Sequence, residues 1–274
     1  MSLRIAFFGT PSFACPSLAA LALAHEVVAV VSQPAKPMGK HLALTDSAVA
    51  QVARDHQLPL FTPQKLREEP FYTEILKLEV EVAVVAAYGK ILPQWLLDWP
   101  KHGMINIHGS LLPKYRGASP VTAALLAGDD ETGITYIKMN AGMDEGEMLA
   151  AFSVAIDTVD TTQSLMDKLA TTAATHIVEV VEGNMSGSLT PVAQDSTMAT
   201  YTSLLKKEDG RIDFNTPPEN LERIIRAYFP WPGVWGDFEG KRVKLLPGGL
   251  VQMEGKTPQI LEQFRLVHPT FPLK

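Results

Sequence analysis

The chain has 274 residues, of which 46% are hydrophobic and 20% are charged, and its formal net charge is −6. This composition is typical of a globular protein with a large buried core, and the length suits one larger domain joined to a smaller one. The single cysteine, Cys15, excludes a disulfide bond within the chain.

Apolar runs of strand length alternate with helical patterns along most of the chain. In chain order, the predicted strands of the larger domain are residues 3–8, 27–32, 60–61, 80–88, 103–107, 133–139 and 148–156. The predicted helices are residues 16–24, a helix that begins at Asp46 or Ser47, residues 71–78, residues 120–126, and residues 161–182 with Thr162 as cap and Gly183 and Asn184 as stop. The alternation predicts an α/β fold with a mostly parallel, Rossmann-like sheet covered by helices on both faces.

The last part of the chain has a different pattern. Residues 201–214 are polar and turn-rich, which indicates a linker, and a short helix over residues 221–228 precedes strands over 235–238 and 242–246. We therefore expect a larger domain over residues 1–200 and a smaller β domain over residues 201–274. Residues 206–274 hold 11 Lys or Arg against 9 Asp or Glu, a net charge of +2, which permits a nucleic-acid partner without requiring one.

No apolar run is suited to a signal peptide or a membrane span. Residues 3–8 are too few for a signal core, and the stretch that follows them is interrupted by Pro16, His25 and Glu26. We expect a cytoplasmic monomer with no membrane partner.

Two polar residues stand at the end of the strand predicted over residues 103–107. Asn106 and His108 are two residues apart, so in a strand their side chains point to the same side. Asp144 lies on a loop between two later strands. An amide can stabilise an oxyanion without changing charge, an imidazole can move a proton, and a nearby carboxylate can orient the imidazole. The three residues together indicate acyl chemistry, although each alone could be structural.

Other kinds of site have weaker signals. The turn Gly9-Thr10-Pro11-Ser12 follows the first strand, but the glycine-rich fingerprints of dinucleotide and nucleoside-triphosphate sites are missing. The histidines are scattered, with His102 and His108 six residues apart, so we expect no metal site.

Motifs along nearly the whole chain to about Lys244 resemble those of the folate-dependent formyltransferases, most closely the branch that acts on methionine-charged initiator tRNA. The motifs are R-I-A-F-F-G-T-P-S-F, S-Q-P-A-K-P, A-A-Y-G-K-I-L-P, G-M-I-N-I-H-G-S-L-L-P-K-Y-R-G-A-S-P, E-T-G-I-T, M-N-A-G-M-D-E-G-E-M-L, R-I-D-F and I-R-A-Y-F-P-W-P-G.

The resemblance implies transfer of the formyl group of 10-formyltetrahydrofolate to the amino group of methionine on initiator tRNA, a step that supports translation initiation. Asn106 would hold the formyl oxygen as it becomes an oxyanion, His108 would take part in proton transfer, and Asp144 would orient His108 and assist proton removal from the amine. The residues that would line the folate pocket are Ser110, Leu111, Leu112, Pro113, Tyr88, Gly89, Ile91 and Leu92.

The resemblance also implies a catalytic N-terminal domain and a C-terminal β domain of the oligonucleotide-binding (OB-like) type that holds tRNA. Candidate tRNA contacts are Lys36 and Lys40, on the loop after Gln33-Pro34, and Arg116. That loop has only two lysines where the family is strongly basic, and the likeness fades after Gly248, so we expect a shortened C-terminal domain and weaker phosphate contacts.

Two alternatives stay open. A relative that formylates an amino-sugar nucleotide or another small amine would use the same Asn106, His108 and Asp144 and would need no long basic surface. A folate-binding protein without turnover would be expected to lack one of the three residues, and all three are present.

Overall fold

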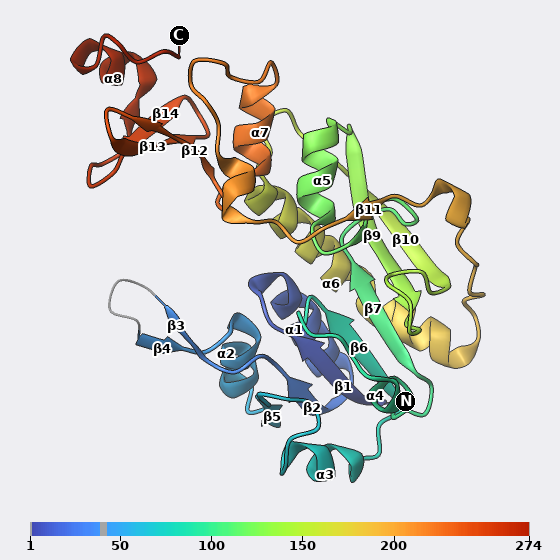
Figure 1. Cartoon of the computed structure of the whole chain (residues 1–274). Coiled ribbons are helices and arrows are strands. Elements are labelled where there is room, and N and C mark those ends of the chain that lie inside the picture. Colours follow the sequence, from blue (N-terminus) through green and yellow to red (C-terminus); the bar gives the residue numbers. More distant parts are fainter. Residues whose placement is uncertain (1, 39–42, 274) are drawn as a thin grey trace. The chain divides into compact units, whose positions relative to one another are not determined.

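The computed structural model describes residues 2–38 and 43–273, which divide into two compact units along an interleaved path (Figure 1). Unit 1 consists of Met1–Arg116, Gly133–Val154 and Asp167–Thr200, and unit 2 of Gly117–Thr132, Ala155–Met166 and Tyr201–Lys274. The assignment of catalysis to residues 1–200 and tRNA binding to residues 201–274 stays a prediction.

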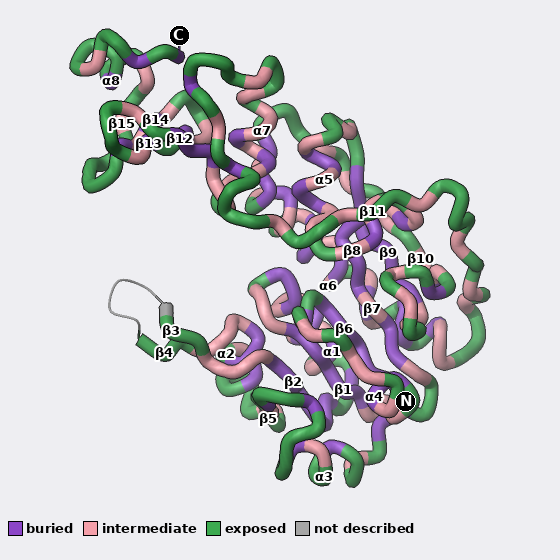
Figure 2. The backbone as a smooth tube through the Cα atoms, in the orientation of Figure 1, coloured by how far each residue is buried: buried purple, intermediate pink, exposed green. Residues whose placement is uncertain are grey.

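Unit 1 is built on a seven-stranded sheet whose order is β10-β9-β7-β6-β1-β2-β5. The strands are β1 Arg4–Gly9, β2 Glu26–Val31, β5 Leu60–Phe61, β6 Val82–Ala86, β7 Met104–His108, β9 Glu131–Lys138 and β10 Met148–Ala155. The pairs β1–β2, β2–β5, β1–β6 and β6–β7 are parallel, and β9 runs antiparallel to β7. The mostly parallel sheet is therefore confirmed, and β6 is buried along its whole length (Figure 2).

Helices cover both faces of this sheet. On one face, Phe8 of β1 belongs to a buried cluster that includes Ile75 of α3 (Phe71–Leu76) and Leu96 of α4 (Gln94–Leu97). Phe7 points to the opposite face, where its ring and Ala14 of η1 (Ser12–Ala14), the short turn before α1 (Cys15–Ala24), both lie against Gly9. Tyr136 of β9 donates a hydrogen bond of 2.6 Å to the carbonyl of Ala173 in the long helix α6 (Thr162–Ser186).

Helix α6 begins and ends differently from the prediction. The hydroxyl of Thr161, rather than Thr162, accepts a hydrogen bond of 3.2 Å from the Ser164 amide in the first turn. The predicted stop at Gly183 and Asn184 is wrong, because the helix continues to Ser186 and ends at Gly187, whose φ is +75°. Gly183 lies inside the helix and allows the close approach of Leu189, which follows the helix and would lie 2.8 Å from an added Cβ.

In unit 1 the cap of one helix was predicted correctly, whereas a short hairpin was not predicted. The cap of α2 (Ala48–Asp55) is confirmed as Ser47, whose hydroxyl accepts a 3.0 Å hydrogen bond from the Ala50 amide. The hairpin of β3 (Lys36–Met38) and β4 (Ala43–Thr45) was not predicted. Its strands are three residues long and β4 is exposed, so they carry no apolar pattern.

Unit 2 combines a helical part with a small antiparallel sheet. Its helices are α5 (Pro120–Ala127), α7 (Leu221–Ala227) and α8 (Leu261–Val267), with the short turn η3 (Lys207–Gly210). The strands β12 (Val234–Phe238), β13 (Lys241–Leu246), β14 (Leu250–Met253) and β15 (Gln259–Ile260) form one sheet in chain order. The β12–β13 turn has two residues with positive φ, Glu239 at +50° and Gly240 at +72°, as a two-residue hairpin turn of type I′ requires.

The remaining short elements are η2 (Ser196–Met198), β8 (Arg116–Gly117) and β11 (Tyr201–Thr202), of which the last two pair. Within the described residues, no helix combines the length and apolar character needed to cross a bilayer.

Two leucines of α1 form a matched pair for testing the core. Leu21 is fully buried and Leu23 is 86% exposed. Leu21→Ala is expected to lower the free energy of unfolding by about 2–5 kcal/mol, because it leaves a cavity under the helix. Leu23→Ala should change it by less than about 0.5 kcal/mol. Urea unfolding followed by circular dichroism measures both, and equal losses would contradict this packing of α1.

Candidate active site

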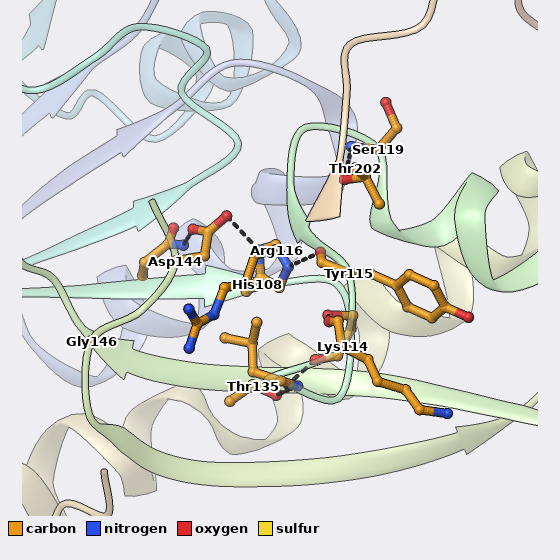
Figure 3. Close-up of polar contacts among 12 residues, drawn as sticks. His108, Lys114, Tyr115, Arg116, Ser119, Thr135, Asp144, Gly146 and Thr202 are labelled. Carbon is orange, nitrogen blue, oxygen red and sulfur yellow. Dashed lines mark hydrogen bonds and ion pairs between the residues drawn. The ribbon is translucent and has the colours of Figure 1, made fainter. Parts of the chain in front are cut away.

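The three residues predicted to act together meet in unit 1. Figure 3 shows two of them, Asp144 and His108, side by side. Asn106 and His108 extend from β7, and Asp144 comes from the loop after β9, 38 positions beyond Asn106. The Asn106 amide nitrogen donates to Asp144 Oδ1 at 3.3 Å, and His108 Nδ1 lies 3.5 Å from Asp144 Oδ2. One carboxylate therefore faces both the amide and the imidazole.

A backbone carbonyl fixes the ring of His108. Its Nε2 atom lies 2.9 Å from the carbonyl oxygen of Tyr115. Because a carbonyl can only accept, Nε2 carries a proton in this bond. Nδ1 is thus the nitrogen that faces Asp144, and a proton on either Nδ1 or the carboxylate is needed for a hydrogen bond between the two groups. The side chain of His108 is only 6% exposed, so few water molecules compete for this contact.

The loop that carries Asp144 has a restrained backbone. Asp144 itself has a φ of +54°, in the left-handed region that most residues avoid. Gly146 passes so close to β9 that an added Cβ would lie 1.7 Å from the carbonyl oxygen of Lys138, so only glycine fits there. Asn140 accepts a 3.0 Å hydrogen bond from the Gly142 amide at the start of the loop. These features give Asp144 a defined position despite its place on a loop.

The segment predicted to contact folate after His108 is held from β9. Thr135 donates a 2.7 Å hydrogen bond to the carbonyl of Ser110 and accepts a 3.1 Å bond from the amide of Leu112. The hydroxyl of Ser110 is fully buried and donates to the carbonyl of Lys114 at 2.6 Å. Leu111 and Pro113 are half-buried, and Leu112 is buried. Ser110 therefore shapes the loop, since its hydroxyl donor is engaged within the protein.

The second predicted folate segment leaves the sheet beside the catalytic strand. β6 and β7 are parallel neighbours with Val85 opposite Asn106, and the Tyr88–Leu92 stretch follows β6. Tyr88 packs in the core, where burial raises the pKa of its hydroxyl to about 12. Its carbonyl accepts from Thr10 and Gln33, and Gln33 also bonds the carbonyl of Gly89. The side chain of Ile91 is 95% exposed and Leu92 is half-buried, so these two offer an apolar surface to a ligand.

The three predicted tRNA contacts have different environments. Lys36 is exposed on β3 and donates to Gln33 at 2.7 Å. Lys40 lies outside the described residues. Arg116 is 1% exposed and bonds Gln194, with Glu145 at 3.7 Å. A buried, engaged guanidinium is not placed to bind a phosphate from solvent, so the structure argues against the Arg116 prediction.

Sequence reasoning missed three groups that hydrogen-bond to the candidate residues or to their loops: the carbonyl of Tyr115, the hydroxyl of Thr135 and the side chain of Gln194. The carbonyl has no sequence signal, because any residue supplies one. Thr135 lies in the middle of a strand and Gln194 in a coil, so neither stands out from its neighbours. The described residues also contain no group of three or more His, Cys, Asp or Glu that could hold a metal ion, and a metal-free reaction stays a prediction.

Comparison with known proteins gives the family. The formyl transferase model matches residues 3–181, and the model of the formyl transferase C-terminal domain matches residues 204–264. The chain therefore belongs to the formyltransferase family. Among curated relatives, the methionyl-tRNA formyltransferase of Geobacter metallireducens is 42% identical over 94% of this chain and 84% of its own length. That of Pseudomonas putida strain W619 is 44% identical over the same shares.

Solved structures share the fold at low sequence identity. A 4-N formyltransferase from Francisella tularensis has a TM-score of 0.69 at 14% identity, covering 89% of this chain and 96% of that one. HypX from Aquifex aeolicus, solved in complex with tetrahydrofolic acid, has a TM-score of 0.67 at 18% identity, covering 90% of this chain and 38% of that one. At these identities the likeness concerns the fold.

The tautomer of His108 can be read from nitrogen-15 chemical shifts. We expect the nitrogen-15 shift of Nε2 to be that of a protonated nitrogen, because Nε2 donates to the carbonyl of Tyr115. His56 is exposed at the end of α2 and serves as the control, with both tautomers populated. Unprotonated Nε2 in His108 would contradict the assignment.

Proposed function

We propose that this protein transfers the formyl group of 10-formyltetrahydrofolate to the amino group of methionine carried by initiator tRNA. The observation that carries the proposal is the convergence of Asn106, His108 and Asp144 on one point at the end of β7. The names of the curated relatives support the choice of donor chemistry and acceptor.

The donor would bind beside the catalytic strand. A folate presents a flat heterocycle, which needs apolar cover together with polar groups along its edge. Ile91 and Leu92 after β6 supply apolar surface, and the loop of Leu111 to Pro113 follows β7. Because Thr135 fixes that loop from β9, its backbone is preorganised for a ligand. These residues fit the proposed co-substrate, which supplies the formyl carbon and the leaving nitrogen.

The first chemical step forms the bond between the amine nitrogen and the formyl carbon. The electron pair of the formyl C=O bond moves to oxygen, and the resulting oxyanion needs hydrogen-bond donors. Asn106 offers an amide nitrogen with two hydrogens, of which Asp144 takes one. The proton on His108 Nδ1, which Asp144 Oδ2 also faces at 3.5 Å, is shared with the oxyanion and provides the second donor from the same side of β7.

The second step requires two proton movements. The attacking amine loses a proton, and the folate nitrogen gains one as its bond to the formyl carbon breaks. Asp144 is placed to accept the first proton, directly or through water, while it holds His108 Nδ1. Since Nε2 is engaged by the carbonyl of Tyr115, Nδ1 is the imidazole atom that gives its proton to the folate nitrogen, and it regains one from Asp144, which carries the proton taken from the amine.

Unit 2 holds a group of cations that could serve an RNA acceptor. Lys207, Arg211 and Arg242 surround the ring of Trp235, with distances of 5.8, 5.5 and 4.4 Å from the lysine nitrogen or guanidinium carbon to the ring centroid. We call these three residues the Trp235 cation cluster. Arg211 pairs with Asp237 at 2.9 Å, while Lys207 is exposed on η3. Lys207 and Arg211 are exposed and Arg242 is half-buried, and exposed cations close together are suited to phosphate contacts.

Incubation of the purified protein with 10-formyltetrahydrofolate and methionine-charged initiator tRNA tests the function, with formyl-methionine on the tRNA as the expected product. Asn106→Ala and His108→Gln should each lower kcat by about a hundredfold or more. The glutamine can keep the bond to Tyr115 but has no group in place of Nδ1. His56→Gln is the matched control and should leave kcat unchanged. Normal turnover by either site variant would refute the residue roles.

The same assay separates the alternative acceptor. Transfer to an amino-sugar nucleotide, with none to the charged tRNA, would overturn the proposed acceptor while leaving the formyl-transfer site intact.

Lys207→Gln tests the Trp235 cation cluster as a tRNA contact. We expect KM for the tRNA to rise several-fold with kcat unchanged, and the slope of log affinity against log salt to fall by about one, because one phosphate contact is lost. Lys77→Gln changes an exposed lysine at the end of α3 and is the control. An equal effect of the two substitutions, or no effect of Lys207→Gln, would contradict the assignment.

A further inference from the structure

We propose that Gln194 is a positioning residue that sets the place of Asp144 relative to His108. Gln194 lies in the coil after α6, 50 positions beyond Asp144, and the family resemblance gave it no role. The inference rests on the proposed function, because it concerns the same three-residue site.

The hydrogen-bonding capacity of the Gln194 amide is fully used. Its nitrogen donates to the carbonyl oxygens of Asp144 and Gly146, both at 2.8 Å. Its oxygen accepts from Arg116 Nε at 3.0 Å and from Arg116 Nη2 at 2.8 Å. A side-chain amide has two N–H donors and two acceptor lone pairs, so these four bonds saturate it and define one orientation. We call this pair of side chains the Arg116–Gln194 brace.

One end of the brace holds the aspartate loop. The two carbonyls that Gln194 binds lie on either side of Glu145, so the amide clamps the backbone at Asp144 and again at Gly146. Asp144 is the residue with a φ of +54°, and a residue held in that region depends on its surroundings. Gln194 therefore binds the loop backbone at Asp144, the residue whose left-handed conformation most needs support from its surroundings.

The other end of the brace adjoins the acceptor of His108. Arg116 follows Tyr115, whose carbonyl binds His108 Nε2 at 2.9 Å. The same coil that carries Gln194 also binds this segment through Thr200, which accepts 2.8 Å hydrogen bonds from the Tyr115 amide at its hydroxyl and from the Arg116 amide at its carbonyl. The segment over residues 194–200, which includes η2, thus binds both the Tyr115–Arg116 backbone beside His108 and the loop that carries Asp144.

Burial makes these bonds costly to break. The guanidinium of Arg116 is 1% exposed, so it cannot exchange Gln194 for bulk water without moving. Glu145 Oε2 at 3.7 Å supplies a nearby negative charge but is itself about half-exposed. The amide of Gln194 joins this buried cation to the backbone of the loop at Asp144 and Gly146.

Gln194→Glu is the sharpest test, because it changes one atom. The carboxylate can still bind Arg116, which protects the fold, but it replaces the N–H donors with an oxygen that faces two carbonyl oxygens. The loop should move, and we expect kcat for formyl transfer to fall by about ten- to a hundredfold. KM for the folate donor should stay within about twofold, and the thermal midpoint should stay close to that of the parent. Gln51→Glu, on the exposed face of α2, is the matched control and should have no effect.

A double-mutant cycle shows whether Gln194 acts through Asp144. In the Asp144→Asn background, Gln194→Glu should lower kcat by less than about twofold, because the carboxylate that it positions is already gone. The same factor in both backgrounds would overturn the proposal, as would parental kcat in the single variant. The nitrogen-15 signal of His108 Nδ1 gives a readout without turnover and should shift in Gln194→Glu but not in Gln51→Glu. If the parent protein formylates no amine while that signal shifts as expected, the proposed function fails and the brace stands.

Discussion

The hydrogen bond from His108 Nε2 to the carbonyl of Tyr115 is the constraint on which the candidate site depends. It turns the imidazole so that Nδ1 faces Asp144, and it assigns the proton-exchanging role to one ring nitrogen. A side-chain acceptor at that position could rotate or titrate, whereas a backbone carbonyl stays in place and only accepts. The chemistry proposed for the amine and the formyl group follows from which nitrogen this bond leaves available.

The sheet explains why the three groups can meet. β7 has a parallel neighbour, β6, on one side and the antiparallel strand β9 on the other. The carboxyl end of β7 therefore lies beside the segment that leaves β6, where the exposed Ile91 is found. β9 supplies Thr135 to the loop after His108, and the chain beyond β9 carries Asp144. The interior strand β7 thus carries Asn106 and His108, and the loop after its neighbour β9 brings Asp144 to them.

The sequence contained enough to predict the α/β fold, because apolar runs identify buried strands, and to predict that Asn106 and His108 share one side of a strand, because side chains two apart do so. It gave no sign of the hydrogen bonds that hold these side chains and their loops in position. Gln194 and Arg116 are 78 positions apart, and no local sequence pattern predicts that their side chains form hydrogen bonds. The same limit made Arg116 look like a surface cation, and Gly183 look like a helix stop when it lies inside α6 and allows a close contact. Local signals predict elements, while contacts between distant segments decide what each polar side chain does.

The central claim is that Asn106, His108 and Asp144 converge on one formyl carbon. A crystal structure of the protein with 5-formyltetrahydrofolate, a stable folate that carries a formyl group, tests this most directly. The account predicts the pterin ring beside Ile91 and Leu92, with the formyl oxygen about 3 Å from Asn106 Nδ2 and His108 Nδ1. A folate bound elsewhere, or a formyl group turned away from all three side chains, would contradict it.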